Sequence, residues 1–152
     1  MSKHKVEWDE KASAAANARR ELPPVVSRYF ELVRDFLAKD PSPRELHRLR
    51  LATKRLRYTL ELFRPCYGPG METRLSELRA LQQLLGEVND SAATSRLVTK
   101  SMRASRQRAR AVKFLDERAA RKAHEFRRHW ANVFDAEGRE RWWTGYLERQ
   151  AR

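Results

Sequence analysis

The sequence predicts an all-α fold, an antiparallel four-helix bundle with helical extensions at its N-terminal and C-terminal ends. Apolar residues recur every three or four positions over most of the chain, the period of a helix with one buried face. Alternating apolar and polar runs bounded by glycine, which would indicate strands, are too few to predict a sheet. Short connections separate the periodic segments, and such connections favour antiparallel neighbours.

The chain of 152 residues is long enough for one domain with a sizeable core. We predict a single domain over residues 1–152, with a core at about 22–135 and an aromatic tail at 136–152.

Two helices are predicted before residue 40. The segment 8–22 is rich in alanine with spaced charges, a weak helical pattern. Pro23 and Pro24 are expected to end it, because the residue before a proline avoids the α-helical region. Pro24 suits the first turn of the next helix, which should continue to about Lys39.

The central helix is expected to begin after Ser42, a good N-cap residue, and to end near Cys66. Glu45 lies three residues after Ser42 and completes the pattern of a capping box. The apolar face of this helix should hold Leu46, Leu49, Leu56, Leu60 and Phe63.

Basic residues form a second stripe on the central helix. At about 100° per residue this stripe lies beside the apolar face, where a packed helix borders a groove. Like charges at this spacing destabilise a helix by roughly 0.2–0.5 kcal/mol per pair, so an anion that neutralises them would be favourable. Arginine suits phosphate because its planar fork holds two oxygens at once. An ordinary solvated face is the alternative interpretation. The stripe consists of His47, Arg50, Lys54 and Arg57.

A third helix is predicted from about Met71 to at least Val98, after a turn at 67–70. Gly86 interrupts it at a cost of about 1 kcal/mol relative to alanine, which predicts a close helix crossing at that point. A loop is expected at 101–107. The apolar face should hold Leu75, Leu78, Leu81, Leu85, Val88 and Ala92.

A fourth helix is predicted over about 109–134, with Gly138 ending this region. Its basic stripe lies nearly opposite its apolar face, which favours a solvated surface. The aromatic segment 141–147 should be helical, and should either fold back on the bundle or meet a partner. The stripe of this fourth helix consists of Arg103, Arg106, Arg110, Lys113, Arg121, His124 and Arg128.

The chain has 33 lysine and arginine residues against 20 acidic ones, a formal net charge of +13. Such an excess predicts acidic partners, namely nucleic acid, an anionic membrane or inorganic polyphosphate. Cys66 is the single cysteine, so a reducing cytoplasm is the expected location. No apolar run is long enough to span a bilayer, and the N-terminus lacks an apolar signal-peptide core.

Catalytic motifs are weak, and we predict a protein that is not an enzyme and uses no metal or cofactor. His124 and His129 are five residues apart, and the zinc motif of metalloproteases requires four. Cys66 has no histidine near it in the sequence, so an inert thiol is the better interpretation. Glu61 lies four residues after Arg57 and should orient that guanidinium.

Two segments carry a resemblance to a known family. Residues 47–58 (HRLRLATKRLRY) resemble the histidine-led basic helix of the CHAD domain family, a family of α-helical polyphosphate-binding modules. Residues 78–90 (LRALQQLLGEVND) resemble that family's Leu-Gly-x-x-Arg/Asn-Asp signature on the following helix. Weaker similarity extends over about 22–130.

The resemblance implies binding of inorganic polyphosphate through basic helix surfaces, without catalysis, and a place in the cytoplasm at polyphosphate granules. Most family members have two four-helix repeats that face each other across a basic cleft, whereas this chain has room for a single repeat. The residues that the resemblance implies for binding are His47, Arg50, Lys54, Arg55, Arg57 and, from the next helix, Arg79.

A homodimer that rebuilds the two-repeat cleft is a further hypothesis. Leu51, Tyr58 and Leu62 lie away from the main apolar face of the central helix, and a second apolar strip indicates a second contact. Packing of Leu51 and Tyr58 under the aromatic tail is the alternative.

The sequence is also compatible with two other functions. The basic fourth helix and the aromatic tail would suit non-specific DNA or RNA binding, through phosphate contacts and stacking. An adaptor that docks on another protein or a granule through its aromatic tail is the third hypothesis.

Overall fold

The computed structural model describes residues 6–152, and the regular elements in this part of the chain are all helices. The all-α prediction is therefore confirmed. No helix within the described residues is both long enough and apolar enough to cross a membrane. The elements in residues 6–152 are α1 (Ala14–Ala38), α2 (His47–Leu62), the 3₁₀ turn η1 (Arg64–Cys66), α3 (Pro69–Ser101), α4 (Arg106–His129), the π-helical turn η2 (Trp130–Phe134) and α5 (Arg139–Arg149).

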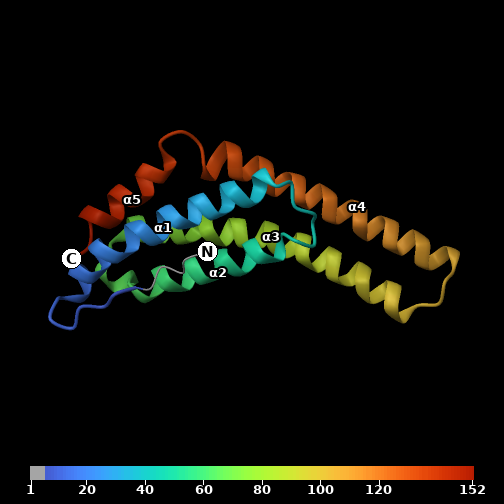
Figure 1. Cartoon of the computed structure of the whole chain (residues 1–152), viewed down its shortest axis with the longest axis horizontal. Coiled ribbons are helices and arrows are strands. Elements are labelled where there is room, and N and C mark those ends of the chain that lie inside the picture. Colours follow the sequence, from blue (N-terminus) through green and yellow to red (C-terminus); the bar gives the residue numbers. More distant parts are fainter. Residues whose placement is uncertain (1–5) are drawn as a thin grey trace.

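The helices pack around one apolar core. α1 packs against α5 and α2, α2 packs against α3, and α3 packs along α4 (Figure 1). The described residues form five α-helices: α1 covers both segments predicted before residue 40, α2, α3 and α4 match the next three predicted helices, and α5 is the predicted helical tail. The antiparallel four-helix bundle stays a prediction. The core includes Leu22, Val26 and Phe30 of α1, Leu49, Leu56 and Leu60 of α2, Leu75, Leu78, Leu81 and Leu85 of α3, and Phe126, Trp130 and Trp143.

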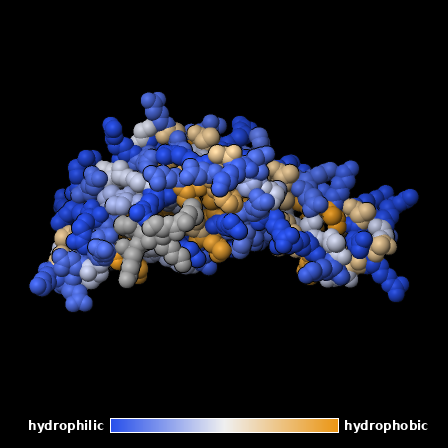
Figure 2. All heavy atoms as spheres, viewed as in Figure 1, coloured by the Kyte–Doolittle hydropathy of each residue, from blue (hydrophilic) through white to orange (hydrophobic). Residues whose placement is uncertain are grey.

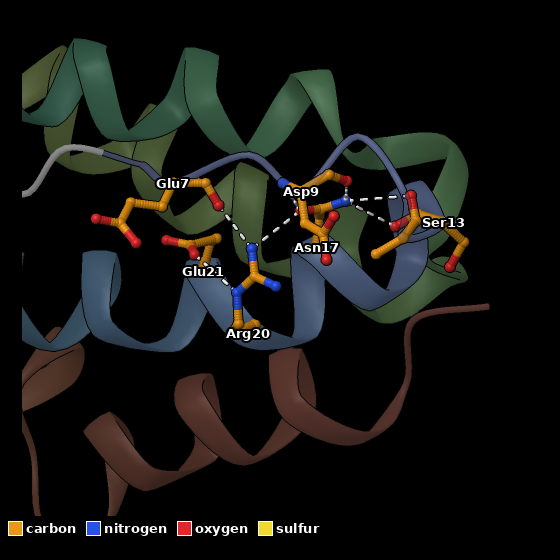
Figure 3. Close-up of polar contacts among 7 residues, drawn as sticks. Glu7, Asp9, Ser13, Asn17, Arg20 and Glu21 are labelled. Atoms are coloured by element: carbon orange, nitrogen blue, oxygen red, sulfur yellow. Dashed lines mark hydrogen bonds and ion pairs between the residues drawn. The ribbon is translucent and has the colours of Figure 1, made fainter.

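The start of α1 is fixed by side chains that satisfy backbone groups (Figure 3). Ser13 Oγ accepts a hydrogen bond from the Ala16 amide at 3.1 Å, as an N-cap does. The buried amide of Asn17 donates to Asp9 O and accepts from Asp9 N, at 3.0 and 2.9 Å. These contacts hold residues 6–13 in an irregular segment, so the helix begins at Ala14 and not near Trp8.

The predicted break at Pro23 and Pro24 is wrong, because α1 continues through both residues. Each proline removes one hydrogen bond of the helix, at a cost of about 3 kcal/mol or more. Tertiary packing offsets that cost: Leu22, Pro23 and Val26 are buried, and α1 lies against α5 as well as α2.

α2 is shorter at both ends than the central helix predicted from after Ser42 to near Cys66, whereas α3 agrees closely with its prediction. The Glu45 amide donates to Ser42 Oγ and the Ser42 amide to Glu45 Oε2, both at 3.3 Å, which is the expected capping box. It stabilises a turn at 43–46, and α2 follows from His47. α3 begins at Pro69, since proline suits the first turn of a helix.

The C-terminal third contains an irregular turn between two helices. The predicted loop at 101–107 is present as a connection over residues 102–105, and α4 starts at Arg106. α4 gives way at Trp130 to the π turn, in which the Asp135 amide donates to Trp130 O at 2.7 Å. This turn stacks the rings of Trp130 and Phe134 with their centres 5.0 Å apart.

The aromatic tail is helical, as predicted, and folds back on the body as α5. Trp143 is fully buried, with its ring centre 5.4 Å from that of Phe134.

Candidate functional site

A polar groove of about 290 Å³ runs between α2 and α3. Its walls come from the stripe on α2 and from residues of α3 spaced three or four apart, which share one face of that helix. The groove is lined by Arg50, Arg57, Arg79, Gln82, Gln83 and Gly86.

Two arginines of α2 enter the groove from beside the buried face. Arg50 and Arg57 are half-buried, between the core residues Leu49, Leu56 and Leu60 and the solvent. Their Nε atoms are buried and have no hydrogen-bond partner among residues 6–152. A buried donor without a partner costs free energy, so both arginines gain from an acceptor that enters the groove.

On α3, Gly86 makes room for an arginine side chain. A Cβ atom at this position would have Arg50 Nε, at 4.0 Å, as its single neighbour from another part of the described chain within that distance. The predicted close helix crossing is therefore absent at Gly86. Gln82 and Gln83 also line the groove, and the buried Oε1 of Gln82 lacks a partner among the described residues.

Carboxylates occupy one end of the groove. Glu61 pairs with Arg57 at 3.1 Å, as its position four residues later predicted, and lies 3.9 Å from Arg79. Glu72 pairs with Arg79 at 2.8 Å and with Arg64 at 2.7 Å. The hydrogen bond from Arg79, and then the charge of Arg64, hold the pKa of Glu72 below its ordinary value. The cations at this end are therefore already largely compensated.

At the other end, His47 Nδ1 lies 2.9 Å from Asn89 Oδ1. His47 of α2 lies opposite Asn89 of α3. Arg50, which is later in α2, lies opposite Gly86, which is earlier in α3. The two helices therefore run in opposite directions here. The Asn89 contact orients the imidazole and leaves Nε2 for another partner.

The remaining residues implied by the resemblance do not line the groove. The Lys54 ammonium lies 5.6 Å from the centre of the Tyr58 ring, and Arg55 is exposed. Neither has an ion pair among residues 6–152. The structure therefore brings Arg50, Arg57 and Arg79 together, with His47 at one end, and leaves Lys54 and Arg55 on the neighbouring surface.

The basic stripe of α4 differs from that of α2. All seven residues of the predicted stripe are exposed, six on α4 and Arg103 just before it, which agrees with the predicted solvated surface. α4 packs on α3 and α2 packs on the same helix, and the groove residues are all from α2 and α3. The two stripes do not meet in one groove.

The aromatic tail has little free ring surface to offer a partner. The Arg74 guanidinium lies between Trp142 and Tyr146, 3.6 and 3.8 Å from the two ring centres. Arg74 also donates to Gly70 O and Trp142 O, at 2.9 and 2.7 Å. Burial lowers the pKa of Arg74 to about 10, so it stays charged at neutral pH. These contacts fasten α5 to the body.

The second apolar strip of α2 is exposed. Leu51, Tyr58 and Leu62 are 39, 47 and 79% exposed, so Leu51 and Tyr58 do not pack under the tail. No group of three or more His, Cys, Asp or Glu residues within 6–152 is arranged to hold a metal ion. The groove instead offers guanidinium and amide groups, which bind anionic oxygens.

Comparison with known proteins identifies the family. The family model of the CHAD domain matches residues 3–99, which include α1, α2 and most of α3. The chain belongs to the CHAD domain family. This domain is associated with polyphosphate binding in general. No curated protein and no solved structure matches the chain.

Within this CHAD domain, the groove was partly foreseeable. The stripe on α2 predicted Arg50 and Arg57, and the family resemblance supplied Arg79. Gln82 and Gln83 were missed as lining residues. The signal that could have found them is the polar stripe at positions 79, 82, 83, 86 and 89 of α3, at the same spacing as the stripe on α2.

Proposed function

We propose that this CHAD domain binds inorganic polyphosphate in the groove between α2 and α3, without catalysing a reaction. The observation that carries the proposal is an open groove lined by two arginines, Arg50 and Arg57, whose buried Nε donors have no partners among residues 6–152. A phosphate oxygen is an acceptor of the right charge for a guanidinium. The family membership supports the same ligand class.

The residues contribute unequally in this proposal. Arg50 has no carboxylate partner among the described residues and makes the first contact. Arg57 and Arg79 bind phosphate in competition with Glu61 and Glu72. Lys54 and Arg55 add attraction from beside the groove, and His47 adds a donor at its end, more strongly when protonated.

We also propose that helices α1–α4 form one four-helix repeat and that two copies pair to complete a cleft. The exposed Leu51, Tyr58 and Leu62 on α2 support this pairing. A place in the cytoplasm, at polyphosphate granules, follows from the proposed ligand. Light scattering at micromolar concentration tests the pairing, and a strict monomer both with and without polyphosphate would exclude it.

The decisive experiment replaces Arg50 and Lys54 together by alanine. We expect polyphosphate affinity to fall about tenfold or more at low salt, because charge-assisted hydrogen bonds are lost. The dependence of affinity on salt should also flatten, since fewer counterions are released, by analogy with nucleic acids. Isothermal titration calorimetry at two salt concentrations measures both effects.

The matched control is the double variant Arg121→Ala and Arg128→Ala, which removes the same charge from the exposed face of α4. It should retain the greater part of the affinity. Equal losses in the two double variants would mean that net charge and not the groove binds the ligand.

Nucleic acid is the second candidate ligand, because the exposed cations of α4 suit phosphate contacts. A competition titration distinguishes the two candidates. If duplex or single-stranded nucleic acid displaces long polyphosphate at equal phosphate concentration, nucleic acid is the better ligand.

A further inference from the structure

The far ends of α3 and α4 form a projecting two-helix arm, residues 93–118. Figure 1 shows this arm, in yellow and orange, extending beyond the other helices. Ser95 Oγ donates to Asp116 Oδ1 at 2.6 Å and joins the two helices along it. At the tip, Arg108 donates to Thr99 O and Met102 O, which caps the end of α3. The arm is thus a built structure and not a loose loop.

The charge of the arm is strongly one-sided. Residues 93–118 contain two acidic residues, Asp116 and Glu117, against eight basic ones. Within the arm, Lys113 pairs with Glu117 at 4.0 Å, and Asp116 accepts a hydrogen bond from Ser95. The basic residues of the arm are Arg96, Lys100, Arg103, Arg106, Arg108, Arg110, Lys113 and Arg118.

Elsewhere, several arginines have close carboxylate partners. Arg34 pairs with Asp135 and Glu140 at 2.6 and 2.8 Å, and Arg139 pairs with Glu77. The arm therefore presents positive charge that the rest of the described chain does not neutralise by such pairs.

Large apolar side chains are exposed among these cations. Leu97, Met102 and Phe114 are 62, 41 and 59% exposed. Leu97 lies two residues nearer the tip than Ser95, and Phe114 two residues nearer than Asp116, so both occupy the same level of the arm. Figure 2 shows orange and tan side chains set among blue ones on this projecting part.

The combination of charge and apolar surface restricts the partner. A second copy of this arm would be repelled by its like charge. Polyphosphate and duplex nucleic acid would meet the cations but leave Leu97, Met102 and Phe114 in water. An anionic bilayer supplies both elements, with acidic headgroups for the cations and an acyl boundary for the apolar side chains.

We propose that the arm docks on the surface of a lipid bilayer that carries anionic headgroups. Leu97, Met102 and Phe114 enter the acyl boundary, and the surrounding arginines and lysines contact the headgroups while their stems lie along the apolar surface. This site is separate from the groove between α2 and α3, so one chain could hold polyphosphate close to a membrane.

The test measures flotation of the full chain with vesicles of phosphatidylglycerol and phosphatidylcholine, compared with vesicles of phosphatidylcholine alone. We expect binding to the anionic vesicles and little to the neutral ones. The double variant Leu97→Ser and Phe114→Ser should bind anionic vesicles at least about tenfold more weakly, because two apolar groups no longer enter the bilayer. Val133→Ser is the control, since Val133 is an exposed apolar residue outside the arm.

Several results would overturn the proposal. Equal binding to neutral vesicles removes the role of charge, and full binding by the serine double variant removes the role of the apolar side chains. Displacement of the protein from vesicles by duplex DNA at equal phosphate concentration identifies the arm as a nucleic-acid surface instead. Circular dichroism confirms that each variant is folded. The Arg50→Ala and Lys54→Ala double variant should float normally, which separates this proposal from polyphosphate binding.

Discussion

Two arginine side chains, Arg74 and Arg50, each lie beside a glycine of α3, and the space around the two glycines differs. At Gly70, an added Cβ would lie 2.6 Å from the Tyr146 ring, which rests on Arg74. At Gly86, an added Cβ would meet only Arg50 Nε, at 4.0 Å. The first site is filled by the chain's own aromatic rings, and the second opens into a groove.

The difference teaches that a buried guanidinium atom without a partner does not by itself indicate a ligand site. Arg74 Nε lacks a partner among residues 6–152, as Arg50 Nε does. Arg74, however, donates its other N–H groups to two carbonyl oxygens and is covered by rings on two sides. Arg50 faces a space that a ligand can enter. Stability should therefore depend on the first site and binding on the second.

The largest expected effect is on stability at the closed site. Trp143→Ala should lower the free energy of unfolding by about 3–5 kcal/mol, because a fully buried ring leaves a cavity. Urea denaturation followed by circular dichroism measures the change. Trp8→Ala, at a ring that is 52% exposed, is the control and should cost far less. A cost at Trp143 as small as that at Trp8 would mean that α5 is not part of the core.

Gly70→Ala should destabilise the protein by about 1–3 kcal/mol, because the new methyl group forces the Tyr146 ring off Arg74. The same substitution should cost much less in a Tyr146→Ala background, where the obstructing ring is gone. A double-mutant cycle in urea gives this coupling, and strict additivity would contradict the contact.

Gly86→Ala should have the opposite sign and stabilise the protein by about 1 kcal/mol, since alanine is the better helix former and the space is free. Its polyphosphate affinity should stay close to that of the parent chain. Gly86→Leu, which fills the groove beside Arg50, should weaken binding while the protein stays folded. Unchanged binding by the leucine variant would show that the ligand does not use this groove.

The smallest expected effect is at Glu72. Glu72→Gln should strengthen polyphosphate binding about two- to threefold, because it releases Arg79 and Arg64 from a competing carboxylate. Because the pKa of Glu72 is lowered in the folded protein, its ionised form stabilises the fold at pH values above the ordinary pKa of a glutamate. This stabilisation is lost as the pH falls through the lowered pKa of the folded protein. The glutamine variant should lack that part of the acid dependence, as urea titrations at several acidic pH values would show. Weaker polyphosphate binding by this variant would contradict the competition.

Local signals predicted a large part of the fold. The capping pair Ser42 and Glu45 and the loop before Arg106 each depend on a few neighbouring residues, and the structure has both. The turn predicted at 67–70 is shorter, because α3 already begins at Pro69. The failure at Pro23 and Pro24 has a different origin. Whether a proline pair ends a helix depends on the packing around it, and α5, which packs on α1, lies more than 100 residues away in the sequence.

The sequence predicted residues of α2 that line the groove, but not which residues of α3 lie opposite them. Helical periodicity places Arg50 beside the apolar face of α2, and the structure puts it in a groove there. Periodicity does not show which residue lies opposite, so the space left by Gly86 and the contact of His47 with Asn89 were not foreseen. Nor did it show that Glu61 and Glu72 would both neutralise Arg79, because one of those pairs joins different helices and the other spans seven residues.

The π turn at Trp130–Phe134 limits how the length of this chain can vary. It accommodates one more residue per hydrogen-bonded turn than an α-helix does, as the bond from Asp135 to Trp130 shows. Removing one residue there would restore regular α-helical winding and rotate everything that follows by about 100°. Trp143 would then leave its place beside Phe134. Single-residue deletions should consequently be tolerated in the connection at 102–105 and rejected in this turn.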